Sequence, residues 1–451
     1  MSKVIKIKKG LNIKLKGSAE KIFEKSEQAT KFAIKPTDFQ NLTPKLTVKI
    51  DEEVKAGSPL FFDKYQPEVL FTSPVSGKVT AINRGERRKI LEVVIDANST
   101  IDYEDFGTAN PETLSDEQIK EKMLKSGVWP LIKQRPYGII ASPKKSPKAI
   151  FISGFDSAPL APDYDFALQG EEKNLQTGIN ALNKLTKGKV HLSLNAEYPT
   201  TGIFKDLKNV EYHHFKGPHP AGNVGIQIYH ISPLNKDEVV WTVTPGDAII
   251  IGRLFNEGKF DAHRVIAMAG SEVKNPRYYK VIAGSSILNL VKDNLLSENV
   301  RCISGNVLTG SKVEKNGFLG FFDNMITVIP EGNFHEFFGW IAPGFNKFSA
   351  AKSYPTWLFP KKEYTLHTNL NGGKRAFVFS GEYENVLPMD ILPVHLLKSI
   401  LVDDIDKMEQ LGIYEVIEED LALCEFVCTS KIEVQSILRN GINTMIKELG
   451  V

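Results

Sequence analysis

Three histidines gather within residues 212–225, whose sequence reads YHHFKGPHPAGNVG. Imidazole groups can donate hydrogen bonds, carry protons or bind metal ions. Gly217, Gly222 and Gly225 allow backbone angles that are closed to other residues, and consecutive amides near Gly222 could point at an anion. The stretch therefore predicts a shaped loop beside a strand-like run over 224–229. Its spacing matches neither glycine-rich nucleotide signature, so a rigid connector is an equal alternative.

The histidines do not form a recognisable metal-ligand motif. His213 and His214 are adjacent, and adjacent side chains in an extended segment face opposite ways. No H-E-x-x-H or Cys/His pairing accompanies them or His219. We therefore expect no metal site in this stretch.

The cysteines are equally uninformative about catalysis. Cys424 and Cys428 have a C-x3-C spacing that places both on one face of a helix, and Cys302 is the third. An iron–sulfur site of four thiolates needs more cysteines than this. We expect buried structural thiols, and the alternative is a metal shared with a neighbouring subunit. Because no nucleophile or paired-carboxylate motif is present either, the sequence identifies no catalytic machinery.

Composition excludes some functions. The chain has 451 residues, with 56 Lys and Arg against 54 Asp and Glu. Its length predicts two to four domains, and its balanced charge argues against nucleic acid as the main partner. Few cysteines and no signal peptide favour the cytoplasm. The longest apolar run, 248–252, is the size of a strand, so we expect membrane association only through a partner.

The elements that must position these residues follow from the hydrophobic pattern. Lys alternates with apolar residues over 1–30, which predicts a strand pair turning at Gly10. Short β-runs over 31–97 resemble the barrel-sandwich hybrid of biotinyl and lipoyl carriers. Lys64 there is expected to be an ordinary exposed lysine rather than a lipoyl-type lysine.

From Ser115 the pattern becomes helical, and strands then alternate with a helix over 171–187. This alternation predicts an open, largely parallel sheet with a ligand crevice at the carboxyl ends of its strands. Phe155-Asp156 and residues 195–198 follow strands, as does the histidine-rich stretch, so we expect one shared cleft. The expected strands cover 148–155, 189–196, 210–215, 224–231 and 241–255.

The last third of the chain is predicted to be β-rich and then helical. Residues 259–300 indicate a small β-grasp-like unit with helical spacing over 287–295. Short β-runs follow over 301–385, including FLGFF and FFGW. A helix is expected from 391 to Gly412, and two more follow it. Its apolar face is expected in the core, through Leu396, Leu397, Ile400 and Leu401.

The chain also resembles a known family, NqrA, which is a subunit of the bacterial sodium-translocating NADH:quinone oxidoreductase. The resemblance covers essentially the whole length, and its central part is also similar to RnfC and to the complex I flavoprotein subunit. Six stretches in the right order carry it: FISGFDSAPLAPD (151–163), NAEYPTT (195–201), HHFKGPHPAGNVG (213–225), RCISGNVLTG (301–310), VIPEGNFHEFFGW (328–340) and EEDLALCEFVCTSK (418–431).

The resemblance implies a multidomain α/β fold. The expected domains are a barrel-sandwich hybrid over 1–105, a Rossmann-like α/β domain over 106–257, a β-grasp domain of the soluble-ligand-binding (SLBB) class over 258–312, and a C-terminal domain with a helical end over 313–451.

Departures from the relatives imply which cofactors are missing. The complex I subunit carries a glycine-rich flavin loop, whereas residues 127–149 here have no such run. Its acidic nucleotide-binding segment appears here as Phe155-Asp156-Ser157-Ala158-Pro159. The resemblance thus implies that the chain binds neither FMN nor NADH and holds no Fe–S cluster.

The implied function is that of a peripheral subunit on the cytoplasmic side of the bacterial inner membrane. It would contribute to ubiquinone binding and reduction coupled to Na⁺ export, and the isolated chain is not expected to be catalytic. Its implied partners are the other subunits of the NqrA–NqrF complex, NqrB first. The alternatives are a docking subunit that positions NqrB without binding quinone and, less favoured, an RnfC-like electron-transfer subunit.

A quinone needs an apolar, aromatic-lined crevice with one or two donors for its carbonyls. Candidate walls are Trp129, Pro130, Tyr137, Phe155 and Phe215. Candidate donors are His214, Lys216 and His219, with Gly217, Gly222 and Asn223 completing the cleft. The alternative is that the vacated flavin cleft is only a docking surface.

Overall fold

A computed structural model describes the chain except residues 1–3, 201, 340 and 450–451. Its centre is a seven-stranded sheet in which the neighbouring strands from β1 to β15 run parallel, and β10 pairs antiparallel with both β15 and β11. In spatial order its strands are β1 (Val4–Lys6), β14 (Glu211–Lys216), β13 (Val190–Asn195), β12 (Ile150–Ser153), β15 (Val240–Thr242), β10 (Lys133–Arg135) and β11 (Ile139–Ile140). The expected parallel α/β sheet is thereby confirmed.

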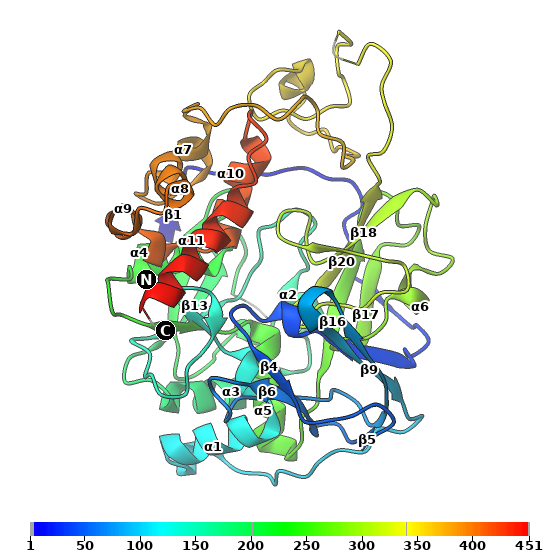
Figure 1. Ribbon diagram of the computed structural model, residues 1–451, viewed down its shortest axis with the longest axis vertical. Coiled ribbons are helices and arrows are strands. Elements are labelled where there is room, and N and C mark those ends of the chain that lie inside the picture. The colour runs from blue at the N-terminus through cyan, green and yellow to red at the C-terminus, as the bar shows by residue number, and fades with distance from the viewer. Residues whose placement is uncertain (1–3, 201, 340, 450–451) are drawn as a thin grey trace.

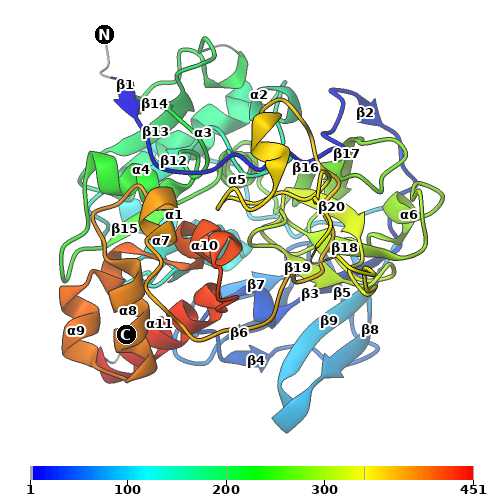
Figure 2. The ribbon, with the colours of Figure 1, turned by 90° about the horizontal axis from the view of Figure 1, so that it is seen from above.

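Helices cover both faces of this sheet (Figures 1 and 2). One face packs against α3 (Glu172–Lys184) and α5 (Pro245–Glu257), with α1 (Asp116–Ser126) beside them. Helix α1 begins directly after Ser115, as the sequence predicts, and Ser115 forms a capping box there. Helices α3 and α5 cross at Gly178 and Gly252, and the absence of side chains at these two residues allows the helices to approach closely. A Cβ at Gly252 would lie 1.8 Å from the Asn174 carbonyl oxygen. The opposite face carries α4 (Val224–Ile231).

Two of the predicted strands, over 224–231 and 241–255, are wrong. Residues 224–231 form helix α4, although their β-branched residues favour a strand. The chain must cross from β14 to β15, which pairs in parallel with β12, and such a crossover needs more than a tight turn. Residues 241–255 divide into the end of β15 and most of α5, where Thr244 caps the helix and Pro245 occupies its first turn. The run 248–252 is thus helical.

The N-terminal segment is not the expected hairpin. Strand β1 pairs in parallel with β14, and β2 (Phe23–Glu24) pairs with β17 in another sheet. Between them the chain crosses the molecule (Figure 2). Gly10 has φ +142°, and a Cβ there would lie 2.2 Å from the His219 carbonyl oxygen. Position 10 therefore requires glycine because the backbone there lies against residues 218–219. A hairpin turn is not the reason.

Three further sheets lie beside the central one. The six-stranded sheet has the order β19-β18-β20-β16-β17-β2 and carries the short helix α6 (Leu288–Val291). Together they form the expected SLBB-like unit, which is confirmed. A four-stranded and a three-stranded sheet form the barrel-sandwich hybrid, in which Lys64 is exposed as expected. Their remaining strands are β16 (His263–Ala269), β17 (Arg277–Ile282), β18 (Val300–Ser304), β19 (Ser311–Val313), β20 (Met325–Pro330), β3 (Lys31–Ile34), β5 (Glu53–Val54), β8 (Gly77–Arg84), β9 (Ile90–Ala97), β4 (Pro44–Leu46), β6 (Pro59–Asp63) and β7 (Leu70–Thr72).

The C-terminal part is helical, as expected, but its first helix is broken. Residues 393–401 and 405–410 form separate helices, and Leu401 is 56% exposed whereas Leu396, Leu397 and Ile400 are buried. The runs FLGFF and FFGW contain no described strand, and Trp340 lies outside the described residues. The other helices are α2 (Tyr164–Ala167), α7 (Glu382–Val386), α8 (Pro393–Leu401), α9 (Ile405–Gln410), α10 (Glu418–Val427) and α11 (Val434–Leu449).

The C-terminal helices pack as one cluster against β1, β14 and α4, at the upper left of Figure 1. All three cysteines are buried and free, as the sequence predicts. Among the described helices, none combines the length and apolarity that crossing a bilayer requires.

Candidate functional site

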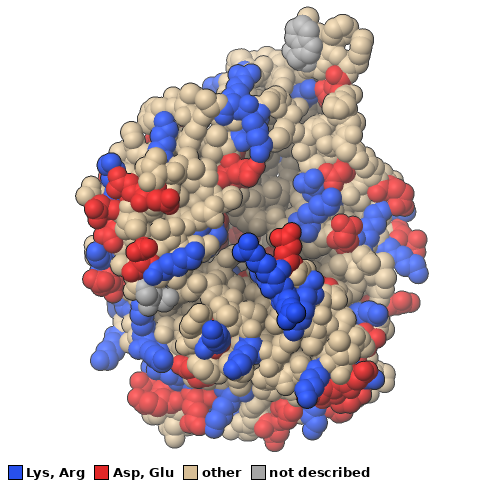
Figure 3. All heavy atoms as spheres, in the orientation of Figure 1, with Lys and Arg blue, Asp and Glu red and all other residues tan. Residues whose placement is uncertain are grey.

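A cavity of about 190 Å³ lies at the carboxyl ends of β12 and β15, the position expected for a ligand crevice in this sheet. We call it the crevice. The α/β sheet, the loop after β18 and the start of α10 all contribute to its lining. Its apolar walls include Phe155, Leu308, Phe322 and Ile417. Figure 3 shows that this face of the molecule is hollowed near its centre, with charged side chains around the rim.

Residues 217–223 connect β14 to α4, and we call them the histidine loop. The His219 imidazole lies in the crevice, where its Nδ1 is 3.0 Å from Ser157 Oγ. The Gly222 amide donates to the same hydroxyl at 2.8 Å. A hydroxyl that accepts from Gly222 can give its one proton to His219 Nδ1, which leaves the proton of the neutral ring on Nε2. His219 can then act as a hydrogen-bond donor.

The N-terminal segment holds the histidine loop in place. The His219 amide donates to Asn12 Oδ1 at 2.9 Å, and the Leu11 amide donates to the His219 carbonyl at 2.8 Å. These contacts fix the backbone on both sides of the ring. The position of His219 thus depends on residues far away in sequence.

Arg135 joins the crevice to the C-terminal helices. Its guanidinium donates to Glu419 and Asp420 at the start of α10, and the Arg135 side chain is only 2% exposed. A Cβ at Gly225 would lie 2.2 Å from an Asp420 carboxylate oxygen, so only glycine leaves room for this ion pair. The first turn of α10 is a favourable place for carboxylates.

Burial dominates the electrostatics of the crevice. It raises the pKa of Asp156, Asp247 and Glu419 above the ordinary carboxyl range. It lowers the pKa of His219 to about 4, so that this ring is neutral at neutral pH. Burial also lowers the pKa of Lys133, whose ammonium lies 3.6 Å from the centre of the Phe322 ring. Apart from Arg135, whose pKa is raised by its carboxylate partners, the groups of the crevice are therefore favoured in their neutral forms.

A second cavity of about 520 Å³ adjoins the crevice on the side of the six-stranded sheet. Tyr164, Thr244, Asp247 and Phe322 line both. The Tyr164 hydroxyl accepts from Asn324 Nδ2 at 2.8 Å, so its own proton remains available to a ligand. A ligand longer than the crevice can thus extend into the neighbouring cavity only past these four residues.

The structure brings four of the eleven expected cleft residues together: Phe155, His219, Gly222 and Asn223 line the crevice. The Asn223 amide group also donates to the Glu419 carbonyl at 3.0 Å. Asp156 lines the crevice as well, but residues 195–198 do not. Two of the three segments that were expected to share one cleft therefore do so.

The other seven residues lie elsewhere. Trp129 and Pro130 are buried in the core, and Phe215 is fully buried under the C-terminal helices. Tyr137 packs its ring against Tyr414. His214 lies 3.4 Å from Thr200 Oγ1, and Lys216 is exposed and pairs with Glu197. A Cβ at Gly217 would lie 2.2 Å from the Ile7 carbonyl oxygen. None of them lines the crevice.

Sequence reasoning missed Arg135, Tyr164, Leu308 and Glu419. The segments 301–310 and 418–431 stand out in the sequence only because they match relatives. A buried cation needs a buried anion, but nothing in the local sequence shows that Arg135 meets residues 284 and 285 positions further along.

Comparisons with known proteins agree over nearly the whole chain. The NqrA N-terminal barrel-sandwich hybrid domain matches residues 5–98, the NqrA second alpha/beta domain matches 114–260, and the NQRA C-terminal domain matches 265–315. The chain is 40% identical to the NqrA subunit of the Na(+)-translocating NADH-quinone reductase of Hahella chejuensis, over 99% of this chain and 100% of that one. It is 38% identical to the NqrA subunits of Neisseria meningitidis serogroup A and Yersinia pestis, with the same coverage.

Similarity to solved structures is weaker. An NAD⁺-reducing [NiFe]-hydrogenase in the air-oxidized state aligns with a TM-score of 0.39 and 11% identity, covering 77% of this chain and 67% of that chain.

Proposed function

Because this chain belongs to the NqrA family of the Na⁺-translocating NADH-quinone reductase, we propose that it serves as a subunit of such a complex and binds ubiquinone in the crevice. The observation that carries the proposal is a neutral, buried donor in an apolar-walled crevice. His219 is 4% exposed and its ring is uncharged at neutral pH, which suits an uncharged carbonyl ligand.

The residues present fit a quinone head group. The ring can stack between apolar walls such as Phe155 and Leu308, and its carbonyls can accept from His219 Nε2 and the Tyr164 hydroxyl. The quinone supplies the redox chemistry when bound. What this chain contributes is orientation, exclusion of water and hydrogen bonds to oxygens that become more negative on reduction.

We further propose that the chain holds no flavin and no iron–sulfur cluster. Residues 127–149 contain no glycine-rich run that would let the backbone hold a flavin phosphate. Helix α10 and its ion pair with Arg135 close one side of the crevice. The three cysteines of the sequence cannot supply the four thiolates of a cluster.

A second candidate function is docking, which a different surface favours. Residues 331–381 expose several large apolar side chains, and this segment projects at the top of Figure 1. The exposed fraction is highest at Phe337, at 90%. The other exposed apolar residues of this segment include Phe338, Ile341, Phe345, Trp357, Leu358 and Phe359. Such a patch is typical of a surface that another protein covers. We propose that it contacts the membrane subunit NqrB, which would place this chain on the cytoplasmic side of the membrane as a peripheral subunit.

Replacing His219 by Ala is expected to weaken the binding of a short-chain ubiquinone by about 10-fold, since one buried hydrogen bond contributes about 1 kcal/mol and water must then fill the space. Titration of the purified chain by calorimetry or by Trp fluorescence measures this.

Lys216→Ala is the matched control, because Lys216 lies next to the histidine loop but pairs with Glu197 outside the crevice. Its affinity should equal that of the parent chain. If the two variants lose affinity equally, or if the parent chain binds no quinone either alone or in the assembled complex, the crevice is not the quinone site.

A further inference from the structure

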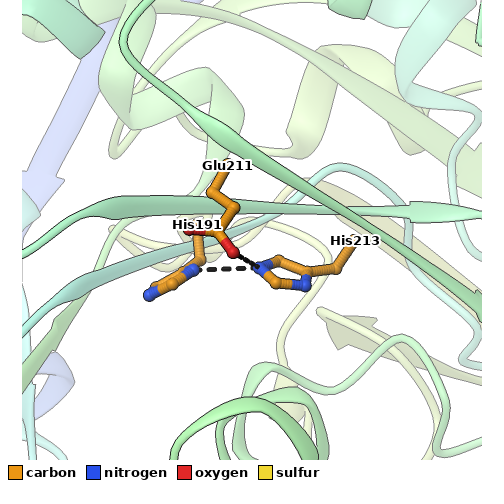
Figure 4. Close-up of side chains that lie close together, drawn as sticks. All are labelled: His191, Glu211 and His213. Carbon is orange, nitrogen blue, oxygen red and sulfur yellow. Dashed lines mark hydrogen bonds and ion pairs between the residues drawn. The ribbon is translucent and has the colours of Figure 1, made fainter. Parts of the chain in front are cut away.

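Two neighbouring strands bring two imidazoles and a carboxylate together. His191 lies on β13, and Glu211 and His213 lie on β14. His191 is the register partner of Glu211, and His213 is two residues further along β14. Because residues alternate between the faces of a strand, all three side chains lie on the same face of the sheet. Figure 4 shows them pointing toward one another.

The nitrogen and oxygen atoms are already close to metal-ligand spacing. His191 Nδ1 lies 2.9 Å from His213 Nε2, and Glu211 Oε1 lies 3.9 Å from the same nitrogen. Metal–ligand bonds of ~2.1 Å at tetrahedral angles hold ligand atoms ~3.4 Å apart. These two distances each need to change by about 0.5 Å, and all three ligand atoms lie within 4.8 Å of one another.

We propose that His191, Glu211 and His213 form a binding site for a divalent transition-metal ion of the zinc type, with a water molecule as the fourth ligand. Two imidazoles and one carboxylate are a ligand set that Zn²⁺ accepts. This is the one cluster with such spacing among the residues that the structure describes.

Neighbouring groups orient two of the ligands. The Phe151 ring stacks on His191, with ring centres 4.7 Å apart and planes at 25°. Lys189 donates to Glu211 Oε2 at 2.6 Å, which leaves Oε1 free to turn toward His213. Such outer contacts fix ligand orientation in metal sites. The Lys189 charge opposes a cation, but its side chain is 69% exposed and solvent screens it.

The imidazoles are available to a metal. A neutral imidazole has a lone pair on one of its two nitrogens, and His191 Nδ1 and His213 Nε2 already face each other. In the hydrogen-bonded pair one of the two facing nitrogens carries a proton, and metal binding would move that proton to the other nitrogen of the same ring. His213 and Glu211 are 16% and 41% exposed, which leaves room for the water.

The site is separate from the crevice. His191 and Glu211 lie at the beginning of β13 and β14, whereas the crevice lies at the carboxyl ends of the strands. An ion there would join two strands of the central sheet without contacting a quinone. The proposal therefore stands independently of the proposed function.

The test is Zn²⁺ binding to the full chain without a histidine tag, after treatment with a chelator. Calorimetry should find one site per chain, and Co²⁺ should give the intense visible bands of tetrahedral coordination. His191→Gln and His213→Gln should each weaken Zn²⁺ binding by about 100-fold, and Glu211→Gln by about 10-fold.

His214→Gln is the matched control, because His214 is adjacent on β14 but faces the other side of the sheet. It should bind Zn²⁺ like the parent chain. Circular dichroism of each variant establishes that it is folded. No Zn²⁺ binding by the parent chain, or binding that folded His191→Gln and His213→Gln variants retain in full, would overturn the proposal.

Discussion

Replacing Arg135 by Met is expected to lower the free energy of unfolding by about 3–5 kcal/mol, the cost of leaving a buried carboxylate without its partner. Arg135 is 2% exposed, and the Asp420 side chain with which it pairs is fully buried. Methionine fills much of the volume but provides no donor. The first turn of α10 should then separate from the crevice, and denaturant unfolding measures the loss.

Lys236→Met is the matched control for Arg135→Met. Lys236 also connects the α/β domain to the C-terminal helices, through Glu409, but its side chain is 57% exposed. Solvent screens such a pair, so the expected loss is at most about 1 kcal/mol. Equal losses in the two variants would mean that Arg135 does not hold the C-terminal helices in place.

Replacing Trp241 by Ala is expected to lower the free energy of unfolding by about 3–5 kcal/mol as well, because it leaves a large cavity in the core. Trp241 is fully buried on β15, directly before Thr242 of the crevice, and its ring meets the Trp129 ring edge to face at 5.4 Å. Thermal or denaturant unfolding measures the effect. Full stability of the folded variant would contradict this packing.

The two tryptophans should differ when each is replaced by Phe. Trp129 Nε1 donates to the Ala141 carbonyl at 2.7 Å, whereas Trp241 Nε1 has no hydrogen-bond partner among the described residues. Trp241→Phe removes an unsatisfied donor, while Trp129→Phe leaves a buried carbonyl without its donor. Trp129→Phe should therefore cost about 1–3 kcal/mol more than Trp241→Phe. A larger loss for Trp241→Phe would contradict this assignment.

The sequence predicts the fold well where the signal is local. The cap at Ser115 marks the start of α1, and the alternation of strands with helices gives the parallel sheet. The prediction from sequence fails where the path of the chain, rather than local composition, determines whether a segment is a helix or a strand. Residues 224–231 have the composition of a strand, but the crossover from β14 to β15 requires a helix there.

The candidate site is less predictable, since its residues meet only in the folded chain. Local reasoning placed His219 and Phe155 in a cleft because both follow strands, and in the structure both line the crevice. It assigned Trp129 and Phe215 to the same cleft because both were expected near the ends of strands and are aromatic, but both are core residues. The pairing of His191 with His213 joins two strands, so the spacing within either strand could not reveal it.

Photolabelling with a ubiquinone that carries a diazirine on its ring shows directly whether ubiquinone binds in the crevice. The experiment uses the assembled complex and the isolated chain, with mass spectrometry of the labelled peptides. We expect label in residues 153–164 and 305–310, competed by unmodified ubiquinone and reduced in the His219→Ala variant but not in Lys216→Ala. Competable label confined to other subunits, or to parts of this chain away from the crevice, would contradict the account.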